Sequence, residues 1–179
     1  LDYTLEHFER ARSPRIVVNY HYLGEQVAAH VRARRSTLDS AATGHAAEFA
    51  LSEEEVLLET GGGIVQALPV LGKVPFFSAN ADTIWIDGAS PALARMDELF
   101  EEERFDALLL LHPVERAVGY RGPGNFGLTP QGELRRTPDP PYVFTGLQLL
   151  HPRLLQGRKA EPFSLRELYQ TAERSDGTL

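Results

Sequence analysis

Two short segments of this 179-residue sequence hold residue types that could bind a ligand. The first, ETGGG (59–63), lies between an apolar run and a helical pattern. The first backbone N–H groups of a helix are free donors at its positive end. Glycines there let a base or a sugar approach the main chain. A tight turn between a strand and a helix is the alternative interpretation. The spacing matches neither GxGxxG nor GK[ST].

The second segment, SANAD (78–82), ends on Asp82 at the end of a predicted strand. A carboxylate at that place needs water, a cation or hydrogen-bond donors, because an unpaired buried charge is unfavourable. Magnesium binds one or two carboxylates together with phosphate oxygens and water. Asp82 is therefore a candidate ligand of a magnesium–nucleotide complex, and a solvated aspartate at a strand end is the alternative. Asp87, which precedes a glycine, fits a turn.

Other patterns of catalytic residues are absent from the sequence. The six histidines show no HExxH spacing, no serine lies in a GxSxG motif, and there is no cysteine. A cysteine nucleophile and a thiolate metal site are thereby excluded. The acidic segment ELFEEERFD (98–106) lies in and after a predicted helix, so it indicates a solvated face.

Alternating helical and strand patterns must position these segments. Helices are predicted over 2–12, 23–35, 64–71, 90–103 and 164–174, and strands over 15–19, 48–52, 74–82 and 106–113. Asp2, Ser90 and Ser164 are the expected helix caps, and 36–45 is an expected loop. The run DALLLLHP is apolar throughout, which is typical of a parallel strand covered on both faces. We predict an α/β fold with an open, mostly parallel Rossmann-like sheet flanked by helices, and a β-hairpin-rich excursion after Pro113.

Composition limits the classes of protein that fit. Hydrophobic residues make up 42% and charged residues 24%, which suits one globular domain over 1–179. The net charge of −7 disfavours non-specific binding of nucleic acid. No apolar run approaches the roughly 20 residues that span a bilayer, and no signal peptide is visible, so no membrane partner is expected. The lack of cysteine fits a reducing compartment, which favours a cytoplasmic protein.

Several segments in a fixed order resemble the sugar-1-phosphate nucleotidyltransferases, in particular their N-acetylmuramate-1-phosphate uridylyltransferase branch. They are LDYTLEHF, NYHYLGEQVAAHV, LLETGGGI, PFFSANAD, ALLLLHPVERAVGY and PYVFTGLQLLHPRL. The resemblance implies a nucleotide-diphospho-sugar transferase fold, with a nucleotide-binding half (1–112) and a sugar-binding half (113–179). It implies transfer of a nucleoside monophosphate from a nucleoside triphosphate to a sugar 1-phosphate, with release of pyrophosphate. It leaves the oligomeric state open.

The resemblance also implies roles for residues. Asp82 matches the catalytic magnesium aspartate, and Mg²⁺ is the expected cofactor. The nucleotide-binding residues implied are Glu59, Thr60, Gly61, Gly62, Gly63 and Asn80, and the sugar-binding residues are Gly119, Tyr120, Thr145 and Gly146. Ala81 stands where the family usually has glycine.

The family's Gly-rich phosphate-binding loop and its second metal aspartate are expected outside this sequence, so the sequence is expected to be truncated at both ends and inactive as it stands. The alternatives are a mannose-1-phosphate guanylyltransferase or another nucleotide-sugar pyrophosphorylase, and a non-catalytic nucleotide-sugar-binding module that lacks the loop.

Overall fold

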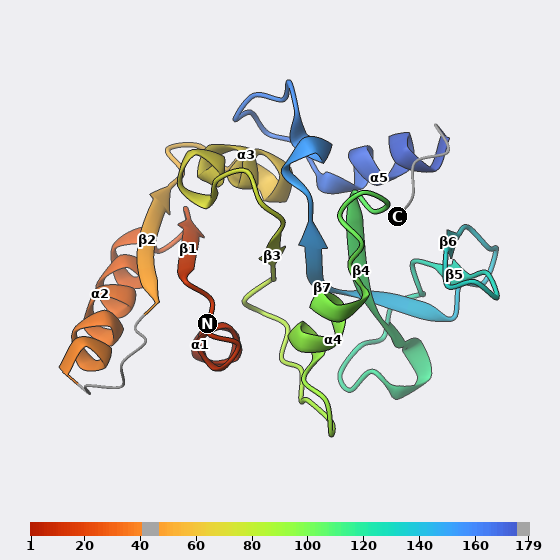
Figure 1. The fold of residues 1–179 in the computed structure, drawn as a ribbon, viewed down its shortest axis with the longest axis horizontal. Helices are drawn as coiled ribbons and strands as arrows, with labels where there is room; N and C mark the ends of the chain where they lie inside the picture. Colours follow the sequence, from red (N-terminus) through yellow and green to blue (C-terminus); the bar gives the residue numbers. More distant parts are fainter. Residues whose placement is uncertain (41–46, 175–179) are drawn as a thin grey trace. The chain divides into compact units, whose positions relative to one another are not determined.

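The computed structural model describes residues 1–40 and 47–174 (Figure 1). The elements follow in the order α1 (Asp2–Arg10), β1 (Arg15–Tyr20), α2 (Gly24–Ser40), β2 (Glu48–Glu53), α3 (Glu59–Leu71), β3 (Phe76–Ser78), α4 (Ala92–Leu99), β4 (Ala107–Pro113), η1 (Val114–Arg116), β5 (Gly127–Leu128), β6 (Leu134–Arg135), β7 (Tyr142–Leu150), η2 (Pro152–Leu155) and α5 (Leu165–Arg174). They form two compact units. The first comprises Leu1–Val74 and Leu155–Leu168, and the second comprises Pro75–Leu154 and the chain from Tyr169 onward.

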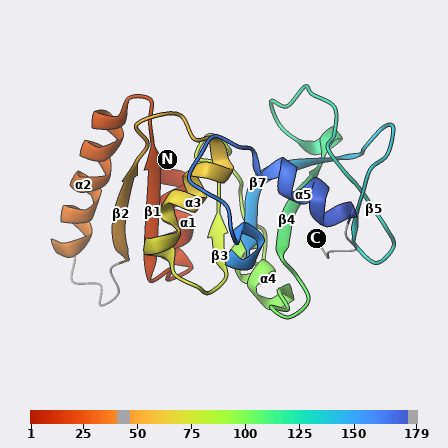
Figure 2. The ribbon, with the colours of Figure 1, turned by 90° about the horizontal axis from the view of Figure 1, so that it is seen from above.

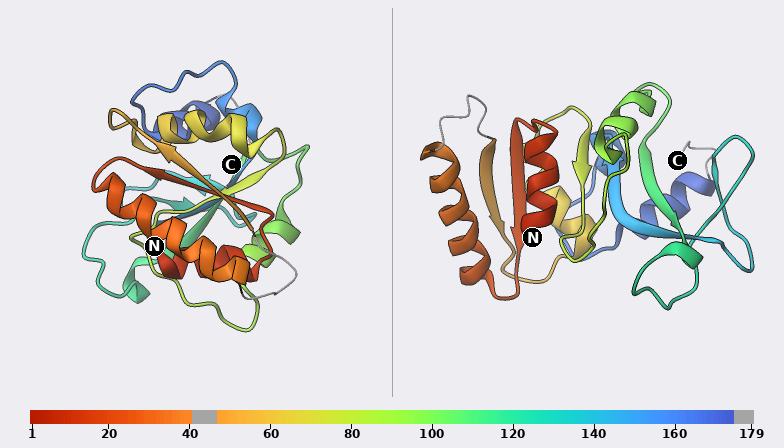
Figure 3. Two further views of the ribbon diagram at one scale, coloured as in Figure 1. Left: turned by 90° about the vertical axis from the view of Figure 1, so that its left-hand side faces the viewer. Right: turned by 90° about the horizontal axis from the view of Figure 1, so that it is seen from below.

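The first unit is built on the parallel pair β1 and β2, whose register runs from Arg15 opposite Glu48 to Tyr20 opposite Glu53. Parallel strands need a crossover connection, and α2 supplies it. Helices α1 and α2 cover one face of the pair, and α3 covers the other (Figure 3). The predictions of an α/β fold and of parallel pairing between these two strands are confirmed.

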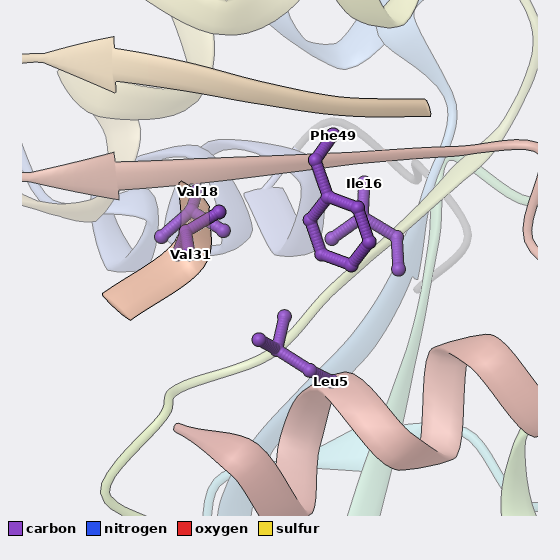
Figure 4. Packing of buried hydrophobic residues seen from close by; sticks show 5 residues of the cluster. All are labelled: Leu5, Ile16, Val18, Val31 and Phe49. Carbon is purple, nitrogen blue, oxygen red and sulfur yellow. The ribbon is translucent and has the colours of Figure 1, made fainter. Parts of the chain in front are cut away.

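The core of the first unit comes from alternate residues of the strands. Ile16 and Val18 point to the same face of β1, because side chains alternate along a strand. They pack with Phe49 of β2, Leu5 of α1 and Val31 of α2 (Figure 4). Burial of each such side chain stabilises the fold by about 1.5–3 kcal/mol. This cluster therefore fixes both helices to one face of the sheet.

A half-buried group of ion pairs also joins α1 to α2. Arg34 donates from Nε and Nη2 to the Glu9 carboxylate at 3.0 and 2.7 Å, and from Nη1 to Asp2 at 3.1 Å. The prediction that Asp2 is the N-cap of α1 is wrong, since the N-cap is Leu1. The Asp2 carboxylate instead accepts from His30 at 2.7 Å, and this hydrogen bond, with the charges of His30 and Arg34, lowers the pKa of Asp2.

Two other predictions of helix boundaries also need correction. Helix α2 continues through Ser40, so 36–40 is not a loop, while 41–45 lies outside the described residues. The N-cap of α4 is Pro91, with no side-chain cap at Ser90. The Asp87 carboxylate, predicted only as a turn residue, accepts from the N–H of Ala92 at 2.9 Å. The cap at Ser164 is confirmed, because its hydroxyl accepts from the N–H of Arg166 at 3.3 Å.

The second unit contains the three-stranded sheet β3–β7–β4, in which both pairings are antiparallel. Figure 2 shows β4 and β7 side by side. The expectation of a mostly parallel sheet thus holds for β1 and β2 and fails here. An apolar run such as that of β4 indicates burial on both faces but does not determine the direction of the partner strand. The excursion with the β5–β6 hairpin brings β7 back antiparallel.

Strand β3 is also shorter than the predicted 74–82, since it ends at Ser78. Among the described residues, no helix is long and apolar enough to cross a membrane.

Candidate active site

The three glycines lie inside a helix and not in a loop before it. Helix α3 begins at Glu59, so Gly61, Gly62 and Gly63 form its first turns, and all three are buried. The prediction of a loop between strand and helix is therefore wrong in its boundary. Glu59 itself has a φ of 56°, a left-handed conformation that is uncommon for residues with a side chain.

The chain itself occupies the space beside each glycine. A Cβ at Gly62 would lie 2.2 Å from the carbonyl oxygen of Glu161, and one at Gly61 would lie 2.3 Å from the ring of Phe163. A Cβ at Gly63 would lie 2.4 Å from Oε1 of Glu54. Intramolecular packing is thus sufficient to require glycine at these positions. Contact of this run with a nucleotide stays a prediction.

Of the four backbone N–H groups at the start of α3, two donate hydrogen bonds to other parts of the chain and two do not. Leu58 donates to Oε2 of Glu54 at 3.0 Å, and Gly61 donates to the carbonyl of Phe163 at 3.0 Å. Within the described part of the chain, the N–H groups of Glu59 and Thr60 have no acceptor. Both residues are exposed at the carboxyl end of β2, the edge of an α/β sheet where ligands bind. Two free donors are thus available to an anionic or carbonyl oxygen.

In the second unit, the structure brings Asn80 together with Gly146. Asn80 donates its N–H to the Gly146 carbonyl at 3.3 Å. Gly146 has a φ of 84°, and a Cβ there would lie 2.7 Å from Nδ2 of Asn80. Both features require glycine, because a side chain would be strained and would clash with the amide.

Thr145 lies in β7, the strand that also holds Gly146, beside an irregularity in the pairing with β4. The β4–β7 register shifts between Leu109 and Leu111, where the Thr145 hydroxyl donates to the Leu110 carbonyl at 2.9 Å. The same hydroxyl accepts from the N–H of Leu147 at 3.3 Å. Bulges of this kind are frequent next to active sites, where they redirect side chains. Three residues of the predicted site, from both the nucleotide and sugar sets, thus adjoin one bulge.

Asp82 lies in an exposed turn beyond the end of β3, and not at the strand end itself. No cluster of three His, Cys, Asp or Glu side chains within the described ranges could hold a metal ion. A single accessible carboxylate does fit magnesium that arrives with a nucleotide, since phosphate oxygens and water complete such a coordination shell. Asp82 would supply the one protein ligand, and the metal would neutralise charge on the phosphates.

Gly119 and Tyr120 follow η1 in an exposed loop. Gly119 has a φ of 79°, and the Tyr120 hydroxyl donates to the Pro123 carbonyl at 2.7 Å. The ring stays 39% exposed, so one part of it is accessible to a ligand. Their assignment to a sugar site remains a prediction.

Sequence reasoning missed two side chains beneath the start of α3, those of Glu54 and Asn19. Glu54 is 8% exposed, and its carboxylate also accepts from Nδ2 of Asn19 at 3.3 Å. Its position directly after an apolar strand was the available signal, but the run EEE (53–55) contains two exposed neighbours of the same type.

Curated proteins include relatives of this chain. It is 35% identical over 175 residues to the N-acetylmuramate alpha-1-phosphate uridylyltransferase of Caulobacter vibrioides strain ATCC 19089, and the match covers 95% of this chain and 69% of that protein. The chain belongs to the N-acetylmuramate alpha-1-phosphate uridylyltransferase family. A second family member, from Neisseria meningitidis serogroup B, is 29% identical over 148 residues, which cover 81% of this chain and 58% of that protein. No model of a known protein family matches the chain.

Several solved structures share the fold of this chain. The inositol-1-phosphate CTP transferase from T. maritima has a TM-score of 0.72 at 14% identity, covering 99% of this chain and 69% of that one. UDP-glucose pyrophosphorylase complexed with UDP-glucose has a TM-score of 0.69 at 13% identity, covering 99% and 75%. These likenesses confirm the nucleotide-diphospho-sugar transferase fold that this family shares.

Proposed function

We propose that the full-length protein to which this chain belongs carries out uridylyl transfer from UTP to N-acetylmuramate α-1-phosphate, with release of pyrophosphate. The observation that carries the proposal is the 35% identity to the Caulobacter enzyme along 95% of the chain. In this reaction a phosphate oxygen of the sugar phosphate attacks the α-phosphorus of UTP. The bond from that phosphorus to the oxygen bridging toward the β-phosphate breaks, and pyrophosphate leaves.

The chain's own residues would position and neutralise the reactants, the main contributions in phosphoryl-type transfer. The free N–H groups of Glu59 and Thr60 would hold the nucleotide, with Gly61–Gly63 behind them. Asn80 would contact the ribose or the sugar beside Gly146.

On the sugar side, Gly119, Tyr120, Thr145 and Gly146 would line the pocket, and Asp82 would hold Mg²⁺. The proposed setting is cytoplasmic recycling of peptidoglycan sugars.

The first test is a pyrophosphate-release assay on the full-length protein with UTP, GTP, CTP or dTTP, each paired with N-acetylmuramate 1-phosphate or mannose 1-phosphate. We expect turnover with UTP and the N-acetylmuramate ester. Preference for GTP with mannose 1-phosphate would replace this assignment with the guanylyltransferase alternative. Binding of UTP without turnover of any pair would favour the non-catalytic module.

The role of Asp82 is tested by Asp82→Asn. We expect kcat to fall by about 100-fold or more, because a catalytic metal supplies several kcal/mol of charge stabilisation. The melting temperature should not change, since Asp82 is exposed. Asp139→Asn, at another exposed turn position of the same unit, is the matched control and should keep full activity. Equal activity of the two variants would remove Asp82 from the mechanism.

A further inference from the structure

Glu54 is a buried carboxylate for which the proposed reaction has no direct use. Its side chain lies under the start of α3 and is 8% exposed. Oε2 accepts from the N–H of Leu58 at 3.0 Å, and Oε1 accepts from Nδ2 of Asn19 at 3.3 Å. Because both oxygens bond to donors of the chain, the carboxylate has no free face for a substrate.

The residues around the Glu54 carboxylate leave space for it and favour its negative charge. Gly63 leaves the space that the carboxylate fills, since a Cβ there would lie 2.4 Å from Oε1 of Glu54 and 2.8 Å from Nδ2 of Asn19. The charge also lies at the positive end of the α3 dipole, which favours an anion. A hydrogen bond from an N–H to a charged acceptor is about twice as strong as a neutral one. These interactions offset the loss of hydration.

Glu54 is also fixed to the end of the parallel strands. Its N–H donates to the Tyr20 carbonyl at 2.9 Å, and its carbonyl oxygen lies 2.7 Å from Nδ1 of His21. The segments that follow β1 and β2 are therefore held side by side at the carboxyl edge of the sheet. The carboxylate extends this connection to Leu58 and so to the first residue of α3.

The conformation that follows Leu58 needs such support. Glu59 has a φ of 56°, and residues held in this region persist where their neighbours fix them. On the other side, Phe163 donates its N–H to the Leu58 carbonyl at 3.2 Å and accepts from Gly61. The backbone of Glu59 and Thr60 is thus held between two fixed points, and its own N–H groups have no acceptor among residues 1–40 and 47–174.

We infer that Glu54 is a positioning residue for nucleotide binding: it holds Leu58 so that the N–H groups of Glu59 and Thr60 are presented to the nucleoside triphosphate. The inference rests on the proposed function, because that function places the nucleotide at this segment. Glu54 acts through Leu58 and does not contact the substrate.

The test compares Glu54→Gln with Glu55→Gln in the full-length protein, since Glu55 is the exposed neighbour of the same type. Glutamine keeps only one of the two terminal oxygens, so in this geometry it loses the acceptor for either Leu58 or Asn19. We expect Glu54→Gln to raise KM for the nucleotide about 10–100-fold, while kcat and KM for the sugar phosphate stay within about 2-fold, because weaker ground-state binding raises KM alone. The control should match the wild type. A loss of structure alone would lower the active fraction and leave KM unchanged.

Asn19→Ala is the second variant, and it tests the positioning role of Glu54 if Glu54→Gln does not fold. It removes one donor to the carboxylate and leaves the bond to Leu58, so we expect a rise in nucleotide KM of about 3–10-fold. Unchanged nucleotide KM in every folded variant would overturn the inference. If the wild type uses a nucleotide other than UTP, only the uridylyl assignment fails, and the same KM ratios are measured with that nucleotide. If it binds no nucleoside triphosphate, both fail.

Discussion

At the level of single residues, the glycine run leaves space that other parts of the chain fill. Gly61, Gly62 and Gly63 each face a different neighbour: a ring, a backbone carbonyl and a carboxylate. Two of the residues that supply these neighbours, Phe163 and Glu54, are also hydrogen-bonded to Leu58 at the start of α3. A substitution in this run therefore changes packing before it changes any contact with a ligand.

The substitution Gly62→Ala tests this packing argument by adding a single Cβ atom. The new Cβ would lie 2.2 Å from the Glu161 carbonyl oxygen, and a backbone atom cannot move aside as the end of a side chain can. We expect the free energy of unfolding to fall by about 1–3 kcal/mol, even though alanine has the better helix propensity. Urea denaturation measures it. Gly88→Ala, with no atom within 4 Å of the added Cβ, should change stability by less than about 0.5 kcal/mol. Equal stability of the two variants would contradict the packing argument.

Among the elements, α5 is attached to β7 by a buried polar pair. The hydroxyl of Tyr169 donates to Oε1 of Gln148, and the two residues are 3% and 2% exposed. Burial raises the pKa of Tyr169 above its ordinary value of 10.0, and the hydrogen bond to Gln148 opposes this only in part. The neutral phenol is therefore the form that the folded state favours.

The pH dependence of stability follows from that shift. Since the folded pKa of Tyr169 lies above the unfolded value of 10.0, its contribution is complete below pH 10 and is lost as the pH rises above it. Tyr169→Phe removes this alkaline loss. At pH 8 it should lower stability by about 1–3 kcal/mol, because Gln148 loses its partner. Guanidinium denaturation at pH 8 and above pH 10 measures both effects. Tyr3→Phe, at a position 62% exposed, should show neither.

Over the whole molecule, stability is expected to differ between its sheets. Strand β7 is the central strand of β3–β7–β4, and Leu147, Leu149 and Leu150 are at most 3% exposed. The β5–β6 hairpin has strands of only two residues each. An amide hydrogen surrounded by buried apolar side chains exchanges only after an opening of high free energy. An amide hydrogen in a short pair of strands exchanges through local opening of low free energy.

Hydrogen exchange followed by mass spectrometry tests this distribution. We expect peptides from β7 to exchange slowest in the second unit and peptides from β5 and β6 to exchange fastest. Strands β1 and β2, which pack with α1 and α2 around Ile16 and Phe49, should be the protected part of the first unit. Exchange in β7 as fast as in the hairpin would contradict the assignment of β7 to the core.

The sequence by itself determined the properties that depend on neighbouring residues. Periodicity predicted β1, β2 and α4, and the order of motifs indicated the family. Residue type made Asp82 a candidate metal ligand, which stays a prediction. The tertiary structure decided the antiparallel direction of β4, the neighbours of the glycine run and the burial of Glu54. Periodicity reports which faces are buried, but not which distant segment covers them. Gly62 meets Glu161, and Glu54 meets Asn19, only because the chain folds back between them.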